Sequence, residues 1–101
     1  MKTTSYTQLD TYETSGNELN IYWNEVAHDP REDETEPYWV YDFCRAKTTD
    51  DYGTLVSKII RSQMSVDAEF AAINNGGSAY EEYQAFRALA KDLASNWVQR
   101  G

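Results

Sequence analysis

The spacing of hydrophobic positions changes once along the chain, close to residue 48. Before that point apolar and polar residues tend to alternate, as they do in half-buried β-strands. The alternating segments are 5–12, 18–26 and 38–45. The turn-forming residues Ser15, Gly16 and Asn17 join the first two segments, so we expect a hairpin there. The first half of the chain therefore predicts a three-stranded antiparallel meander.

Alternation also assigns side chains to the two faces of the predicted sheet. On the second strand one side carries Leu19, Ile21 and Trp23, and the other carries Asn20, Tyr22 and Asn24. On the third strand one side carries Trp39, Tyr41 and Phe43, and the other carries Tyr38, Val40, Asp42 and Cys44. Both faces would carry aromatic rings, Trp39, Tyr41 and Phe43 on one face and Tyr22 and Tyr38 on the other. Aromatic side chains are enriched at interaction surfaces, although tyrosine also covers small sheets without any binding role.

After residue 47 the apolar residues recur at helical spacing. The first predicted helix has the stripe Tyr52, Leu55, Val56, Ile59, Ile60 and Gln63, and its start can be capped by Thr49, Asp50 and Asp51. Ser65, with Asp67 in the first turn, predicts the N-cap of a second helix. The apolar residues of that helix are Val66, Phe70 and Ile73.

Two glycines separate the second helix from a third. Gly76 and Gly77 follow two asparagines, and glycine takes the left-handed conformation past a helix end without strain. Ser78, with Glu81 three residues later, has the pattern of a capping box at the next helix start. The buried stripe of this third helix is expected to be Tyr83, Phe86, Ala90, Leu93, Ala94 and Trp97.

These patterns predict the α+β class, with a three-stranded antiparallel β-meander packed against two to three C-terminal helices. We expect one domain over residues 1–101, made of an acidic meander half (1–47) and a helical half (48–101). The helices are expected to pack on the sheet through Tyr52, Leu55, Val56, Ile59, Ile60, Phe86, Leu93 and Trp97.

The negative charge lies in the first half of the chain. Residues 1–53 carry 12 carboxylates and four Lys or Arg residues, whereas residues 54–101 carry five of each. Like charges held together oppose folding, so their concentration favours a surface that meets a basic partner. A net charge of −8 argues against direct binding of nucleic acid, which needs clustered Lys and Arg. The charged linker 28–37, which ends in Pro37, is expected to form an exposed loop.

Composition also narrows the setting of the protein. Cys44 is the only cysteine, so no intramolecular disulfide can form. The first residues contain no apolar stretch of signal-peptide length, and no segment approaches the roughly 20 apolar residues of a membrane span. We expect a cytoplasmic protein that has no contact with a membrane.

No catalytic or metal-binding motif stands out. The acidic linker with His28 could hold a hard cation, but counting from Asp29 the sixth position of a calcium loop is Glu34 rather than glycine. A thiol–imidazole pair of Cys44 with His28 is disfavoured because a lone cysteine on a strand usually fills a core. A phosphate site at Gly76 and Gly77 lacks the lysine of a P-loop. A small sugar-binding enzyme would need a larger scaffold, so we expect no enzyme, catalytic residue, metal or cofactor.

Part of the helical half resembles small proteins encoded by phages and prophages. The resemblance covers residues 52–69, 80–86 and 90–91, all within the C-terminal half of the chain. Its first pattern, Ile-Arg-x-x-Tyr/Met-Ser, is met at residues 60–65, and its second, Glu-Tyr-x-x-Phe/Tyr, is met at residues 82–86. These positions are packing and capping residues. The resemblance therefore implies a phage or mobile-element origin and transfers no functional site.

The leading functional hypothesis is a non-enzymatic inhibitor that blocks a basic nucleic-acid-binding groove of a bacterial host protein, as DNA mimics and anti-CRISPR proteins do. That partner could be a CRISPR effector, and a homo-oligomer is compatible with the sequence. The expected partner-binding residues are Glu32, Asp33, Glu34, Glu36, Asp42, Tyr22, Tyr38 and Trp39. The alternative is a phage virion or tail-assembly component, which would associate with other copies or with other phage proteins.

Overall fold

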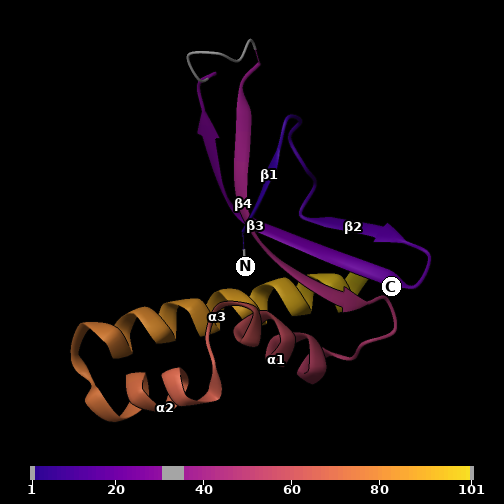
Figure 1. Cartoon of the computed structure of the whole chain (residues 1–101). Coiled ribbons are helices and arrows are strands. Elements are labelled where there is room, and N and C mark those ends of the chain that lie inside the picture. The colour runs from indigo at the N-terminus through magenta and orange to yellow at the C-terminus, as the bar shows by residue number, and fades with distance from the viewer. Residues whose placement is uncertain (1, 31–35, 101) are drawn as a thin grey trace. The chain divides into compact units, whose positions relative to one another are not determined.

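The computed structural model describes residues 2–30 and 36–100 (Figure 1). Within this part of the chain the protein is α+β, with four antiparallel strands in one open sheet and three helices. The chain forms two compact units, residues 1–48 and 49–101. The first holds all the described strands and the second all the described helices, so the boundary lies next to the change in hydrophobic spacing.

The sheet unit is built around one long hairpin. Its strands are β1 (Lys2–Ser5), β2 (Tyr12–Ser15), β3 (Glu18–His28) and β4 (Tyr38–Lys47), in the spatial order β1-β4-β3-β2. Central strands β3 and β4 pair along most of their lengths, and each short strand pairs with one of them. The expected β2–β3 hairpin is confirmed. Gly16 has a φ of 60°, as the first central residue of a type II′ turn requires.

The prediction of three strands is wrong in one respect, because residues 5–12 do not form a single strand. Two four-residue strands flank a connection over residues 6–11. This connection runs from one edge of the sheet to the other, over the face that carries Tyr41, and the Leu9 amide donates to the Tyr41 hydroxyl at 2.9 Å. Of residues 6–11, only Leu9 is partly buried. A run with so few buried positions does not keep a strand in register.

Strand β3 contains a β-bulge at Asn24 and Glu25. Trp23 pairs with Asp42 and Val26 pairs with Val40, so two residues of β3 lie opposite Tyr41 alone. Asn24 has a φ of 54°, a left-handed conformation that asparagine tolerates better than most residues. Beyond the bulge the alternation is shifted by one residue, which the sequence pattern did not predict.

The helical unit contains α1 (Tyr52–Gln63), α2 (Val66–Asn75) and α3 (Gly77–Arg100). Two of the expected N-caps are confirmed: Asp51 accepts from the Thr54 amide at 2.8 Å, and Ser65 accepts from the Ala68 amide at 3.1 Å. The third is wrong, because α3 already includes Ser78. Gly76 and Gly77 both have a φ of 64°, so the chain reverses between α2 and α3 at a pair of residues without side-chain strain.

Helix α3 contacts both α1 and α2. The buried side chains of the unit are Leu55, Ile59, Ile60, Ala72, Tyr83, Ala90, Leu93 and Ala94. Most of them belong to the stripes predicted for the first and third helices. Tyr52 was expected in the core but is exposed, since it occupies the first position of α1. Val66, Phe70 and Ile73, the apolar residues that the sequence assigned to this second helix, are exposed.

One carboxylate connects all three helices. Glu69 on α2 accepts a hydrogen bond from Tyr83 on α3 and an ionic hydrogen bond of 2.6 Å from Arg61 on α1. The hydrogen bond from Tyr83, followed by that from Arg61, lowers the pKa of Glu69 below its ordinary value of 4.5. The same bond to Glu69 raises the pKa of Tyr83 above 10.0. At neutral pH this hydrogen bond therefore stabilises both the protonated phenol of Tyr83 and the ionised carboxylate of Glu69.

Ile59→Ala is expected to lower the free energy of unfolding by about 2–5 kcal/mol, because Ile59 is completely buried and a cavity would remain. Urea denaturation measures the change. Val98→Ala, at an exposed position of the same unit, serves as the control and should change stability by less than about 0.5 kcal/mol. Equal effects of the two substitutions would contradict the burial of Ile59.

Glu69→Gln is expected to destabilise the protein by about 1 kcal/mol at neutral pH, because the amide keeps the shape but loses the charge that Arg61 and Tyr83 meet. The folded-state pKa of Glu69 is lowered, so its stabilisation is complete above pH 4.5 and is lost as pH falls through the folded value. Unfolding curves of the two proteins should therefore converge in acid. A difference that persists at low pH would show that the charge is not responsible.

Candidate binding surface on the sheet

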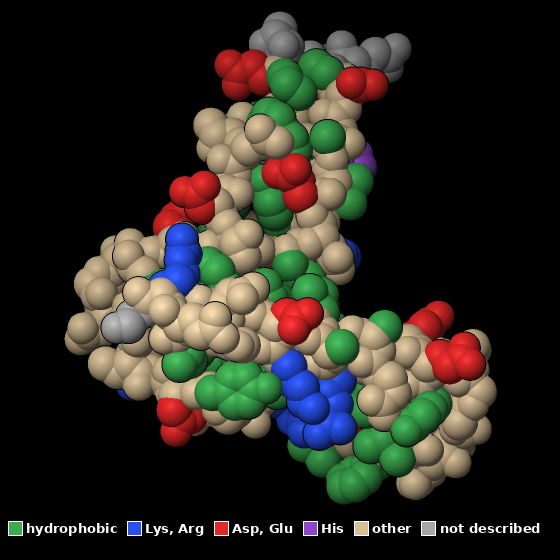
Figure 2. Space-filling view, turned by 180° about the vertical axis from the view of Figure 1, so that it is seen from behind, with side chains coloured by type: hydrophobic (Ala, Val, Ile, Leu, Met, Phe, Trp, Pro, Cys, Tyr) green, Lys and Arg blue, Asp and Glu red, His purple; other side chains and the backbone are tan. Residues whose placement is uncertain are grey.

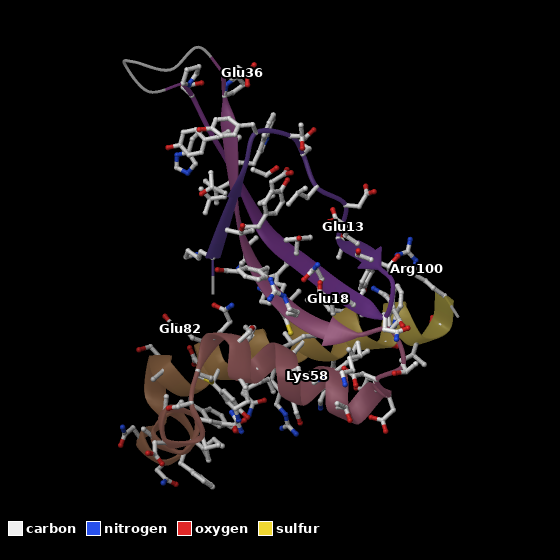
Figure 3. All side chains as sticks on the ribbon, turned by 45° about the vertical axis from the view of Figure 1, so that its right-hand side comes forward. Glu13, Glu18, Glu36, Lys58, Glu82 and Arg100 are labelled. Atoms are coloured by element: carbon white, nitrogen blue, oxygen red, sulfur yellow. The ribbon has the colours of Figure 1, made fainter. Side chains whose placement is uncertain are left out.

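The far end of the β3–β4 hairpin carries several of the residues singled out from the sequence. We define residues 24–30 and 36–41 as the distal arm. Glu36 is exposed just before β4, and Figure 3 shows it at this end of the hairpin, away from Glu13 and Glu18. Glu25 and Asp29 are exposed on the β3 side. The expected site residues Glu32, Asp33 and Glu34 lie outside the described residues.

Apolar and aromatic side chains accompany these carboxylates on the arm. The ring of Tyr38 stacks on the His28 imidazole, with centroids 4.9 Å apart and planes 5° from parallel. Next to this pair Val26 faces Val40 across the strands, and Val26 is 51 % exposed. Trp39 lies half-buried opposite Ala27. A surface with carboxylates and aromatic rings therefore occurs beyond the end of β2, where β3 is an edge strand of the sheet.

Tyr22, Tyr41 and Phe43 lie on the face that carries Trp39, nearer the middle of the sheet. Tyr22 lies directly across from Phe43, with ring centroids 6.2 Å apart, and makes an edge-to-face contact of 5.8 Å with Tyr41. The sequence pattern predicted Tyr22 on the face opposite Tyr41 and Phe43. The strand register shows that this prediction is wrong. Tyr22 thus shares a face with Trp39, whereas Tyr38 lies on the other face.

Tyr41 is almost fully buried and fixes the connection that crosses this face. Its hydroxyl donates to Glu25 at 2.6 Å and accepts from the Leu9 amide at 2.9 Å. Burial, and then the hydrogen bond to Glu25, raise the pKa of Tyr41 above 10.0. Gln8 contributes a longer bond to Glu25 at 3.3 Å. Glu25 therefore has a structural role that the sequence did not reveal, because the bulge alone brings it over Tyr41.

A second group of carboxylates lies at the other end of the sheet. Glu13 and Glu18 are exposed, and Arg45 Nε lies 3.8 Å from Glu18 Oε1. Burial, followed by the charge of Glu13, raises the pKa of Tyr22. Tyr22 is therefore a neutral phenol at neutral pH, near the Glu13 carboxylate.

Asp42 was expected on the partner-binding surface, but the structure places it in the interior of the sheet. It is 7 % exposed, accepts an ionic hydrogen bond from Lys2 at 2.7 Å and accepts another from Asn24 at 2.8 Å. Burial alone would raise its pKa, but the bonds from Lys2 and Asn24 outweigh that effect and lower it. A carboxylate held by β1 and the bulge is not free to imitate a phosphate.

The geometry also bears on the alternatives considered from the sequence. Cys44 is buried opposite Ile21, whereas His28 lies seven positions further along β3, roughly 20 Å away at the rise of a strand. These two side chains cannot form a catalytic pair. Over residues 2–30 and 36–100, no cluster of three His, Cys, Asp or Glu side chains is arranged to hold a metal ion. None of the described helices combines the length and the apolar character needed to cross a bilayer.

Asp42→Asn is expected to lower the free energy of unfolding by about 1–3 kcal/mol, because it removes the charge that Lys2 meets inside the sheet. The folded-state pKa of Asp42 is lowered, so this contribution exists above pH 3.8 and disappears as pH falls through the folded value. Asp10→Asn, at an exposed position, is the control. Similar losses for both variants in thermal denaturation at neutral pH would contradict the structural role of Asp42.

The chain was compared with models of protein families, with curated protein sequences and with solved structures, and none of the three comparisons gave a match.

Proposed function

We propose that this protein is a non-enzymatic binding protein that uses its acidic distal arm to occupy a basic, nucleic-acid-binding surface of another protein. The observation that carries the proposal is the separation of its carboxylates into two kinds. Asp42 and Glu25 are bonded within the sheet, whereas Asp29 and Glu36 are exposed at the end of the arm. Exposed like charges at one end of a hairpin are not needed for folding.

The arm combines two properties of an interface. Its carboxylates favour rapid encounter with a surface rich in Lys and Arg, because charge complementarity mainly raises the association rate. Its rings provide area to bury once contact is made, and Tyr and Trp are the side chains that most often dominate binding energy. Tyr38 and Trp39 point to opposite faces of the arm, so a groove that encloses the arm would contact both.

The biological setting proposed here is inhibition of a bacterial host protein by a phage or mobile-element product in the host cytoplasm, in the manner of a DNA mimic or an anti-CRISPR protein. The resemblance of the helical half to phage and prophage proteins supports this setting. The acidic arm supports the kind of target, because clustered carboxylates can match the spacing of phosphates along a nucleic-acid groove.

The proposal is tested by removing charge from Glu36 at the end of the arm and from residues 32–34, which connect its two strands in the sequence, without changing the length of the chain. The variant replaces Glu32, Glu34 and Glu36 by Gln and Asp33 by Asn. A partner is first captured from a bacterial lysate with the tagged native chain and identified by mass spectrometry. Association of each variant with that partner is then followed by stopped-flow fluorescence. The neutralised variant is expected to associate about tenfold more slowly, and raising the salt concentration should slow the native chain in the same way.

The control variant carries the same change in net charge in the helical unit, at the exposed residues Asp67, Glu81, Glu82 and Asp92. It should associate nearly as fast as the native chain if the position of the charge matters. Equal rates for the native chain and the arm variant, with equal salt dependence, would refute the proposal. Capture of capsid or tail proteins in place of a nucleic-acid-binding protein would favour a role in phage assembly.

A further inference from the structure

Helix α2 presents an apolar face to solvent. Val66, Phe70 and Ile73 follow one another at i, i+4 and i+7, so they lie along one side of the helix. They are 46 %, 58 % and 43 % exposed, respectively. Their exposure leaves a continuous hydrophobic surface on a helix whose buried face is supplied mainly by Ala72 and Glu69.

Positive charge borders this surface on one side. Glu69 precedes Phe70 and accepts hydrogen bonds from Tyr83 and Arg61, and the charge of Arg87 also reaches it. Arg61 is thus paired with this carboxylate, Arg87 acts on it only through its charge, and both arginines remain exposed. Figure 2 shows Lys and Arg side chains gathered beside hydrophobic side chains on the helical unit. The flank thus has an excess of positive charge next to the apolar stripe.

We propose that the α2 surface, defined as Val66, Phe70 and Ile73 with Arg61 and Arg87, binds an amphipathic helix of a partner protein that carries acidic residues beside its apolar face. An apolar stripe with this spacing matches the anchor pattern by which a helix packs against another helix. The arginines would meet the acidic flank of the partner. This interface is separate from the acidic arm and does not depend on the function proposed for it.

Charge argues against a second copy of the chain as the occupant. In a symmetric dimer the same patch meets itself, so the arginines of one α2 surface would approach those of the other. Like charges brought together at an interface weaken association. An acidic partner helix removes this repulsion and uses the same apolar stripe.

The test uses the full chain and two labelled synthetic peptides. Both peptides have leucine at the same helical positions, and they differ only in carrying glutamate or lysine on the flanks. Fluorescence anisotropy is expected to give a dissociation constant at least about tenfold lower for the acidic peptide. The double variant Phe70→Ser with Ile73→Ser should lose at least about tenfold in affinity for the acidic peptide. Arg87→Glu should remove the preference for glutamate over lysine.

The matched control is Val98→Ser, which alters a comparably exposed apolar residue of α3 and should bind the acidic peptide like the native chain. Circular dichroism verifies that each variant keeps its helices, as expected for changes at exposed positions. No loss of affinity for the acidic peptide in the double variant, or an equal loss with Val98→Ser, would overturn the proposal. Sedimentation that reveals a dimer dissolved by Phe70→Ser with Ile73→Ser, with no binding of the acidic peptide, would assign the surface to a second copy instead.

Discussion

A carboxylate taken out of water must be given hydrogen bonds and a cation, and this constraint organises both units of the protein. In the sheet, Asp42 on β4 is met by Lys2 on β1 and by Asn24 on β3. In the helical unit, Glu69 on α2 is met by Arg61 on α1 and by Tyr83 on α3. Each acid joins three elements, so each unit has a polar link where its elements meet.

This arrangement divides the acidic residues of the chain into two populations. Asp42 and Glu69 are satisfied within the fold, and their hydrogen bonds lower their pKa values. Exposed carboxylates such as Asp29 and Glu36 keep the protein negatively charged towards any partner. The exposed carboxylates contribute most to long-range attraction. The net charge of the chain therefore overstates the charge that is available for binding.

Local signals predicted the helical unit better than the sheet. The caps at Asp51 and Ser65 act within three residues, so they can be recognised in the sequence directly. Strand β1, in contrast, exists because Lys2 and its neighbours pair with β4, 40 residues away. No pattern within residues 2–5 predicts that pairing. The alternation of residues 5–12 alone was too weak to form a single strand.

For the candidate site, the sequence identified the aromatic rings and the acidic residues but not the bonds that they make within the fold. Alternation placed Trp39 and Tyr38 on opposite faces, as the register of β4 with its neighbours confirms. It could not show that Asp42 is bonded to Lys2, since the two meet only after the sheet has formed. The bulge, which brings Glu25 over Tyr41, also cannot be predicted from strict alternation. The exposure of the α2 stripe depends on how closely three helices approach, which spacing does not determine.

The single thiol can report local opening of the sheet. Cys44 is 1 % exposed on the central strand β4, and the chain contains no other cysteine. A thiol reagent can reach it only during excursions that expose the middle of the sheet, so its rate of alkylation measures how often those excursions occur. The helical unit contributes no thiol to the signal. One chemical label, followed over time, therefore reports local opening around β4 under native conditions, without denaturant.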